Sequence, residues 1–251
     1  MTMSDVQIIQ ELRKFDTATI CNVVATYPES DICLKLYDAW DGEYYTDTSL
    51  HCIYPELGPL CGYAATAWYS DKKPEHTQLD PWILYDHLST TAKPVILVAK
   101  QTYSEGLLNK SGLFGGMMTT EFKAFGTIGV VTDGPMRDYV EIREQNVQYL
   151  ATGFTSGHGD TQLRGANIPV TVAGMTVKPG DLIHMDQCGA CKFPADKLAK
   201  VLEYATELLQ REANEKKVFQ DQSFTLEKWK KKRSREQIPQ VRTKKNTEAV
   251  L

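Results

Sequence analysis

The order of apolar and helical segments in the middle of the chain constrains the fold more than any other feature. Residues 94–100 (PVILVAK) and 127–131 (TIGVV) are short, unbroken apolar runs, which are typical of strands covered on both faces. Between them lies a segment whose apolar residues recur at helical spacing, namely Met118, Phe122 and Phe125. A further helix is predicted over about 137–150. This strand, helix, strand, helix succession predicts an α/β core.

The flanking segments extend this core. Further helices are predicted over residues 5–15, 16–27, 81–91 and 196–217. Further strands are predicted over 60–69, 170–172 and 175–177, with a strand pair within 182–193. Loops are predicted over 28–56 (with short strands), 70–79 and 153–165. We therefore expect packed N-terminal helices in 1–27, one domain in 28–217 and a basic extension in 218–251.

Composition is that of a soluble protein. The 251 residues are 42% hydrophobic, but they contain no run of about 18 apolar residues, the length needed to cross a membrane. The polar first residues contain no secretory signal, so we expect a cytoplasmic protein with six reduced cysteines. Residues 226–251 carry nine Lys or Arg and three Glu, a charge of +6, which leaves −10 for residues 1–225. The acidic body argues against nucleic acid as a partner; the basic tail suits a weak RNA contact or a solvated helix face.

The stretch from residue 115 to residue 141 holds the candidate site. Gly115 and Gly116 open the predicted helix, so the backbone N–H groups of residues 115–118 (including Met117 and Met118) form a socket for a carboxylate or phosphate. Arg137 can grip an acid with two hydrogen bonds, and Asp138 and Glu141 can share one helix face. Two carboxylates beside an anion socket suggest Mg²⁺ or Mn²⁺. A plain surface ion pair is the alternative for Arg137 and Asp138.

The spacing from Gly116 across twenty residues to Arg137, Asp138 and Glu141 resembles the G-x20-R-D-x2-E/D signature of the RraA-like class II pyruvate aldolases. These include the 4-hydroxy-4-methyl-2-oxoglutarate/4-carboxy-4-hydroxy-2-oxoadipate aldolases. Three other segments resemble family blocks: KFDTATICNVV (14–24), LGPLCGYAATA (57–67) and PGDLIHMDQCGACKFP (179–194). Together the resemblance covers about residues 7–215.

The resemblance implies a swivelling β/β/α fold and a homotrimer or hexamer with sites near subunit boundaries. It further implies a metal-dependent lyase that cleaves a 4-hydroxy-2-oxo acid to pyruvate and a carbonyl product, or decarboxylates oxaloacetate. Asp138 would hold the metal with Glu141 in support, Arg137 would stabilise the enolate oxygen, and residues 115–118 would bind the substrate carboxylate. A metal-bound water is the expected proton shuttle. The alternative is a non-catalytic binding protein that resembles the RNase E regulators of the same family.

Several features leave alternatives open. Family members usually carry an acid in the glycine loop, where Gly116 or Met117 stands here. His184, Cys188 and Cys191 have a spacing that suggests zinc, against which buried thiols in a hairpin are the plainer interpretation. His158 and Asp160 fall in a predicted loop that is either solvated or reaches a neighbouring subunit's site. Lys123 is considered as a Schiff-base lysine, but it falls mid-helix and a metal makes it unnecessary.

Overall fold

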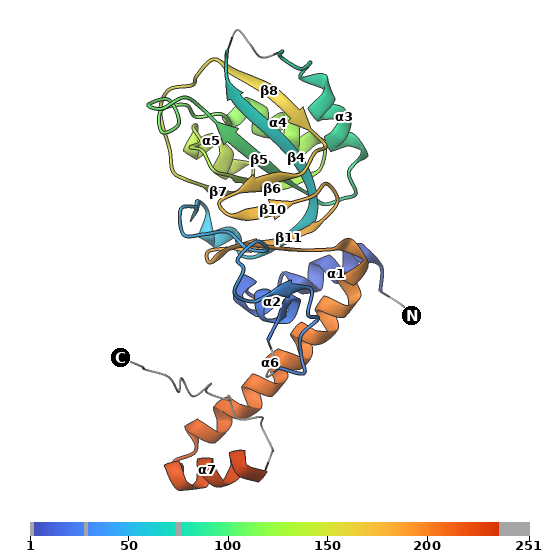
Figure 1. Cartoon of the computed structure of the whole chain (residues 1–251), viewed down its shortest axis with the longest axis vertical. Coiled ribbons are helices and arrows are strands. Elements are labelled where there is room, and N and C mark those ends of the chain that lie inside the picture. Colours follow the sequence, from blue (N-terminus) through green and yellow to red (C-terminus); the bar gives the residue numbers. More distant parts are fainter. Residues whose placement is uncertain (1–2, 28–29, 74–76, 236–251) are drawn as a thin grey trace, which may run out of the picture.

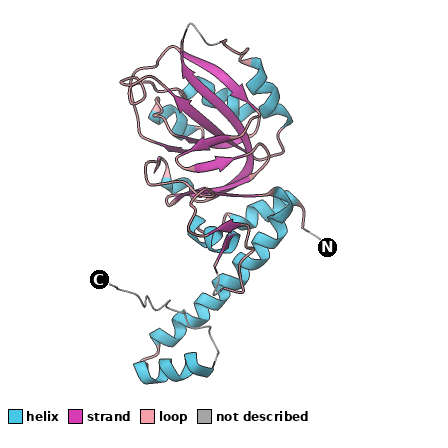
Figure 2. Ribbon diagram, in the orientation of Figure 1, coloured by secondary structure: helices cyan, strands magenta, loops and turns pink. Residues whose placement is uncertain are grey.

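A computed structural model of the protein describes residues 3–27, 30–73 and 77–235 (Figures 1 and 2). The helices are α1 (Asp5–Leu12), α2 (Thr17–Val24), α3 (Trp82–Thr90), α4 (Gly116–Ala124), α5 (Tyr139–Glu144), α6 (Leu198–Gln220) and α7 (Leu226–Arg235), with 3-10 turns at Pro55–Leu57 and Ala195–Lys197. The strands are β1 (Ala25–Thr26), β2 (Tyr37–Asp38), β3 (His51–Cys52), β4 (Leu60–Asp71), β5 (Val95–Thr102), β6 (Thr127–Thr132), β7 (Gln148–Ala151), β8 (Thr161–Ala166), β9 (Val170–Val172), β10 (Met175–Val177), β11 (Leu182–Asp186) and β12 (Gly189–Phe193).

One mixed sheet organises the body. Its strand order is β12-β11-β4-β5-β6-β7-β3, and β8 pairs with β4 beside this path. The four central strands β4, β5, β6 and β7 run parallel, and each connection between them passes through a helix: α3, α4 and α5 in turn. The predicted α/β core is therefore confirmed, including the strands at 94–100 and 127–131 and the helix between them.

Both faces of the central strands are buried. On one face, side chains of α3, α4 and α5 pack against the sheet around Phe114, Phe122 and Ile142, all fully buried. On the other, Ile96, Val98 and neighbouring apolar residues meet the β9–β10 hairpin. Covering both faces explains why β5 and β6 read as unbroken apolar runs in the sequence.

The N-terminal helices pack at the far end of the sheet, against α6 and the β11–β12 hairpin (Figure 1). Asp16 caps α2, because its carboxylate accepts a hydrogen bond from the Thr19 N–H at 2.6 Å. Helix α6 begins in this cluster and then projects away from the body, where α7 folds back beside its end (Figure 1). The Phe219 ring packs against the rings of Phe224 and Trp229 at this turn, with distances of 5.3 Å and 5.5 Å between ring centroids.

Two predicted element bounds are wrong near the site. The helix expected over 137–150 is only α5, because Asn146 adopts a left-handed conformation (φ 55°) that ends it, and residues 148–151 instead form the buried strand β7 beside β6. The loop expected over 153–165 is a loop only as far as Asp160, since β8 then pairs with β4. Pairing with distant strands determines both differences.

Smaller differences lie nearer the N-terminus. Helix α2 ends at Val24 rather than near residue 27, because Ala25 turns to extended backbone and pairs with Tyr37. Within 28–56, where loops and short strands were predicted, Tyr44 is buried in the core while Trp40 stays 79% exposed.

In the described parts of the chain, no helix has the length and apolar character needed to cross a membrane. All six cysteines carry free thiols, as expected.

Candidate functional site

The candidate site lies where the parallel strands β5 and β6 end. The chain leaves β5 through residues 103–115 into α4, and it leaves β6 through the turn at Asp133 into α5. The Arg137 N–H donates to the carbonyl of Phe114 at 3.0 Å, which ties the two connections together. The carboxyl ends of parallel strands are where α/β proteins bind ligands, because the following loops and helix N-termini converge there.

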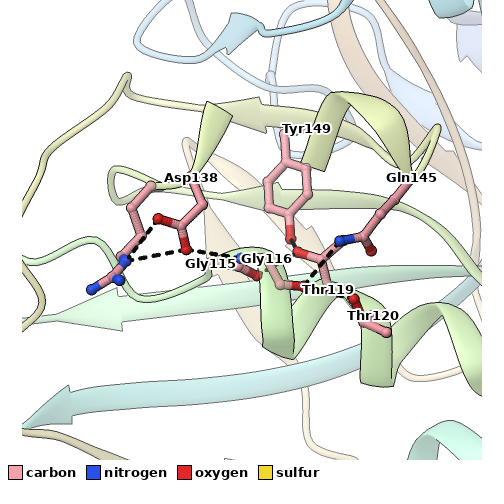
Figure 3. A network of polar contacts seen from close by, with 8 residues as sticks. Gly115, Gly116, Thr119, Thr120, Asp138, Gln145 and Tyr149 are labelled. Atoms are coloured by element: carbon pink, nitrogen blue, oxygen red, sulfur yellow. Dashed lines mark hydrogen bonds and ion pairs between the residues drawn. The ribbon is translucent and has the colours of Figure 1, made fainter. Parts of the chain in front are cut away.

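Asp138 lies against the start of α4 (Figure 3). The Gly116 N–H donates to Asp138 Oδ2 at 3.0 Å, and Arg137 Nε lies 3.4 Å from each carboxylate oxygen. Gly115 permits this approach, because a Cβ at that position would lie only 2.4 Å from Asp138 Oδ2. The predicted anion socket therefore already contains one anion, and the carboxylate belongs to the protein itself.

The backbone at Asp138 is unusual. Its φ of 59° and ψ of 46° place it in the left-handed region, directly before α5. This conformation costs most L-residues about 1–2 kcal/mol, although Asp and Asn tolerate it better than others. Asp138 is thus not on the helix face that the sequence assigned to it together with Glu141, because helical geometry begins only at Tyr139.

Glu141 instead packs against Gly116. A Cβ on Gly116 would lie 2.0 Å from the Glu141 Cδ, well inside normal contact. The Glu141 carboxylate therefore occupies the space in which a side chain at position 116 would begin. Where the family resemblance leads us to expect a loop acid, this chain has a glycine, and an acidic group from α5 lies beside it.

Hydrogen bonds hold the first turn of α4 in place (Figure 3). Thr119 Oγ1 donates to the Gly115 carbonyl at 2.8 Å and lies 2.7 Å from the hydroxyl of Tyr149 on β7, while Gln145 Nε2 donates to the Gly116 carbonyl at 3.1 Å. Since the single Thr119 proton goes to Gly115, Tyr149 is the donor in the second bond. Within the described residues, the N–H groups of Met117 and Met118 have no protein acceptor, so they remain available to a ligand.

A cavity of about 520 Å³ opens over these groups. Its wall contains all of the predicted site residues except Gly116, whose position behind Glu141 keeps it out: Gly115, Met117, Met118, Arg137, Asp138 and Glu141. The loop before β8 contributes His158 and Gly159 to the wall, and the first residue of β8 contributes Thr161. The His158 side chain is exposed, as the solvated-loop interpretation expected, and it also lines the cavity of its own chain. The signal in the sequence was a histidine between two glycines.

The oxygen ligands in the cavity suit a hard divalent cation. Asp138 and Glu141 contribute carboxylates to the wall, and Mg²⁺ typically takes one or two carboxylates and completes its shell with water and substrate oxygens. No group of three His, Cys, Asp or Glu side chains in the described residues is arranged to hold a metal. A cation here would therefore be held by the two carboxylates, water and substrate, as Mg²⁺ or Mn²⁺ commonly are.

The other candidates lie outside this cavity. Both ring nitrogens of buried His184 have protein partners, Thr17 Oγ1 at 2.9 Å and the Leu12 carbonyl at 3.1 Å, which leaves neither for zinc. Burial lowers the pKa of His184, which favours the neutral ring. Lys123 donates to the Gln145 carbonyl at 2.7 Å at the end of α4, away from the cavity wall. Asp160 pairs with Lys72 at 3.7 Å, exposed to solvent.

Comparisons with known proteins show which sequences and structures this chain is similar to. The chain is 31% identical over 84 residues to a Halalkalibacterium halodurans protein named "Putative 4-hydroxy-4-methyl-2-oxoglutarate aldolase", a match that covers 33% of this chain and 40% of that protein. A Burkholderia multivorans protein of the same name is 33% identical over 81 residues, covering 32% and 49%. The chain spans half or less of the length of the curated relatives that it matches.

A solved structure and a family model complete the comparison. RraAS2 from Streptomyces coelicolor, an unusual member of the RNase ES inhibitor RraA protein family, superposes with a TM-score of 0.63 at 20% identity, covering 86% of this chain and 98% of that one. At this identity the likeness concerns the fold, and it confirms the fold expected from the sequence. The family model described as RraA-like, Aldolase/RraA, matches residues 18–191, more than half of the chain. The protein therefore belongs to the RraA-like (Aldolase/RraA) family.

Proposed function

We propose that this protein is a divalent-metal-dependent lyase that cleaves a 4-hydroxy-2-oxo acid to pyruvate and a carbonyl product, and that it also decarboxylates oxaloacetate. One observation carries the proposal. Asp138, Arg137 and the free N–H groups at the start of α4 line one cavity, so a carboxylate ligand, a cation and hydrogen-bond donors face the same space. That combination suits a small acid whose reaction develops negative charge on an oxygen.

The substrate carboxylate binds at the start of α4. The N–H groups of Met117 and Met118 donate to it, and the positive end of the helix dipole favours its charge. Gly116 does not take part, since its N–H donates to Asp138. Gly116 is therefore removed from the four residues that the sequence assigned to binding of the substrate carboxylate.

Asp138, supported by Glu141, would hold Mg²⁺ or Mn²⁺. When bound, the cation acts as a Lewis acid on the 2-keto group. Two donors orient the Asp138 carboxylate for this role. The Gly116 N–H and Arg137 Nε both donate to it, which keeps the side chain in one orientation.

Arg137 binds the oxygen on which charge develops. When the bond between C3 and C4 breaks, its electron pair becomes the C2–C3 double bond of a pyruvate enolate, and the former keto oxygen becomes negative. The Arg137 side chain is 29% exposed at the cavity wall, and its guanidinium donates charged hydrogen bonds to that oxygen. Decarboxylation of oxaloacetate forms the same enolate, so one arrangement serves both reactions.

The family resemblance extends the proposal to the assembly and the domain limits. We expect a homotrimer or hexamer of a catalytic domain over 28–217, flanked by the N-terminal helices and the basic extension from residue 218. A small 2-oxo acid is the expected partner, rather than nucleic acid.

Pyruvate release tests the proposal directly. Purified protein is incubated with oxaloacetate or 4-hydroxy-4-methyl-2-oxoglutarate and Mg²⁺, and pyruvate is followed with lactate dehydrogenase and NADH. We expect release that stops on addition of EDTA and returns with excess Mg²⁺. Asp138→Asn keeps the size of the side chain and suits its left-handed backbone, but it removes the charge, so we expect a loss of turnover with an unchanged melting temperature.

The result could go against this proposal in two ways. Full turnover by Asp138→Asn would remove Asp138 from the mechanism. If EDTA had no effect on pyruvate release from oxaloacetate or from any 4-hydroxy-2-oxo acid tested, and the rate did not exceed that without protein, the alternative function, a non-catalytic binding protein, would be favoured.

A further inference from the structure

Retro-aldol cleavage needs a base, for which the signature motif offers no side chain, only the metal-bound water expected from the sequence. The hydroxyl on C4 must lose its proton as the C3–C4 bond breaks, and the enolate must later gain a proton at C3. Neither Arg137 nor an already coordinated carboxylate suits this exchange, because a guanidinium does not deprotonate in proteins. A neutral imidazole is the side chain most often used for proton transfer.

The loop before β8 supplies an imidazole to the cavity. His158 lines the same cavity as the motif residues, and its side chain is exposed. Backbone hydrogen bonds fix the loop on both sides of it: the Gly157 carbonyl accepts from the Gly112 N–H at 3.0 Å, and the Asp160 carbonyl accepts from the Lys72 N–H at 3.0 Å. These two bonds anchor the backbone on either side of His158, which keeps this residue at the cavity wall.

The His158 side chain is also uncommitted. Among the described residues, no hydrogen bond or ion pair engages its ring, whereas Arg137 and Asp138 on the same wall are paired with each other. The Asp138 carboxylate accepts from Gly116 and Arg137, and Glu141 packs against Gly116. An imidazole without a protein partner at a cavity wall is free to exchange a proton with a substrate bound there.

We propose that His158 is a catalytic residue that accepts the proton of the substrate 4-hydroxyl, an inference that rests on the proposed lyase function. The imidazole takes the proton as the O–H electron pair becomes the C4 carbonyl bond. The C3–C4 pair becomes the C2–C3 bond of the enolate, and the keto oxygen takes the charge beside Arg137. The imidazolium then returns the proton to C3, so that pyruvate and the carbonyl product leave and the ring is neutral again.

The two reactions of the proposed enzyme separate this role from a structural one. In oxaloacetate C4 is itself the carboxylate carbon, so decarboxylation releases it as CO₂ and there is no C4 hydroxyl to deprotonate. His158→Gln has a similar size but cannot accept the proton. We expect its kcat for 4-hydroxy-4-methyl-2-oxoglutarate to fall by about 10²–10⁴, and its kcat for oxaloacetate to fall by less than about tenfold.

Asp160→Asn is the matched control. It lies on the same loop and removes a charge, but its exposed carboxylate contacts Lys72 outside the cavity. We expect both activities of this variant to remain within about twofold of the wild type, as for other surface substitutions.

Each outcome decides the question. Selective loss of aldol cleavage in His158→Gln supports the proposal. Unchanged aldol cleavage in this variant overturns the role of His158, and the lyase function then still holds because the wild type turns over. An equal loss of both reactions also overturns this role, because it indicates that His158 binds the pyruvate half that the two substrates share. No turnover of either substrate by the wild type removes the lyase function and the role of His158 together.

Discussion

Replacing Gly116 by alanine tests the contact between the glycine loop and Glu141 without removing any functional group. The added Cβ would lie 2.0 Å from the Glu141 Cδ and 2.1 Å from Oε2. Carbon atoms in contact lie about 3.5–4.0 Å apart, so the Glu141 carboxylate must move by roughly 1.5–2 Å. Glu141 is exposed, so its side chain can rotate into solvent rather than force the helices apart.

The cost to stability is therefore small. Gly116 begins α4 without a positive φ, and alanine is favoured over glycine in a helix by up to about 1 kcal/mol. This gain offsets much of the cost of displacing Glu141. We expect the melting temperature to change by no more than about 4 °C, which corresponds to about 1 kcal/mol for a chain of this size.

The effect on the cation is larger. Displacing a group that supports a metal ligand typically lowers metal affinity or activity about 10–100-fold. We expect the Mg²⁺ concentration that gives half-maximal pyruvate release to rise by this factor, and Mn²⁺ binding measured by calorimetry to weaken in parallel. The second measurement does not depend on identifying the substrate.

A double-variant cycle checks the physical cause. In Glu141→Ala the methyl group at position 116 has room, so Gly116→Ala should have no further effect in that background. Unchanged Mn²⁺ affinity in Gly116→Ala would refute the reasoning, as would a double variant whose losses simply add, because either result would mean that the methyl group acts other than through Glu141.

Two more predictions concern the guanidinium and a buried ring. Arg137→Lys should lower kcat about 10²–10³-fold, since an ammonium cannot make the two-pronged contact; an unchanged kcat in the pyruvate assay would make Arg137 structural. His87 Nε2 accepts from the Thr66 N–H at 3.1 Å, and burial lowers the pKa of this ring below its ordinary 6.5. At low pH the unfolded chain therefore protonates His87 while the folded chain does not. The free energy of unfolding has its full value above about pH 7 and decreases below pH 6.5, by at most about 1.4 kcal/mol per pH unit. Urea titrations at pH 7.5 and 5.5 should show a smaller drop in His87→Gln, and equal drops would contradict this assignment.

Local sequence patterns predicted most of the helices and strands. The apolar runs of β5 and β6, the helical spacing of α4 and the cap at Asp16 depend on neighbours within a few residues, so periodicity and capping chemistry predict them. Strand β7 was missed because its burial comes from β6, far away along the chain, and its short run continued a helical pattern. Strand β8 was read as loop for the same reason, since it is ordered by pairing with β4.

The candidate site divides in the same way. The sequence by itself predicted the α/β class of the core. It also indicated Gly116, Arg137, Asp138 and Glu141 as candidate site residues, because their spacing and chemistry can be read along the chain. Only the tertiary structure decided that Asp138 takes the Gly116 N–H and that Glu141 fills the space beside this glycine. It also decided that His158 reaches the cavity. These contacts depend on how the ends of separate strands are placed in the sheet, and strand pairing is set by packing across the whole domain rather than by neighbours in the chain.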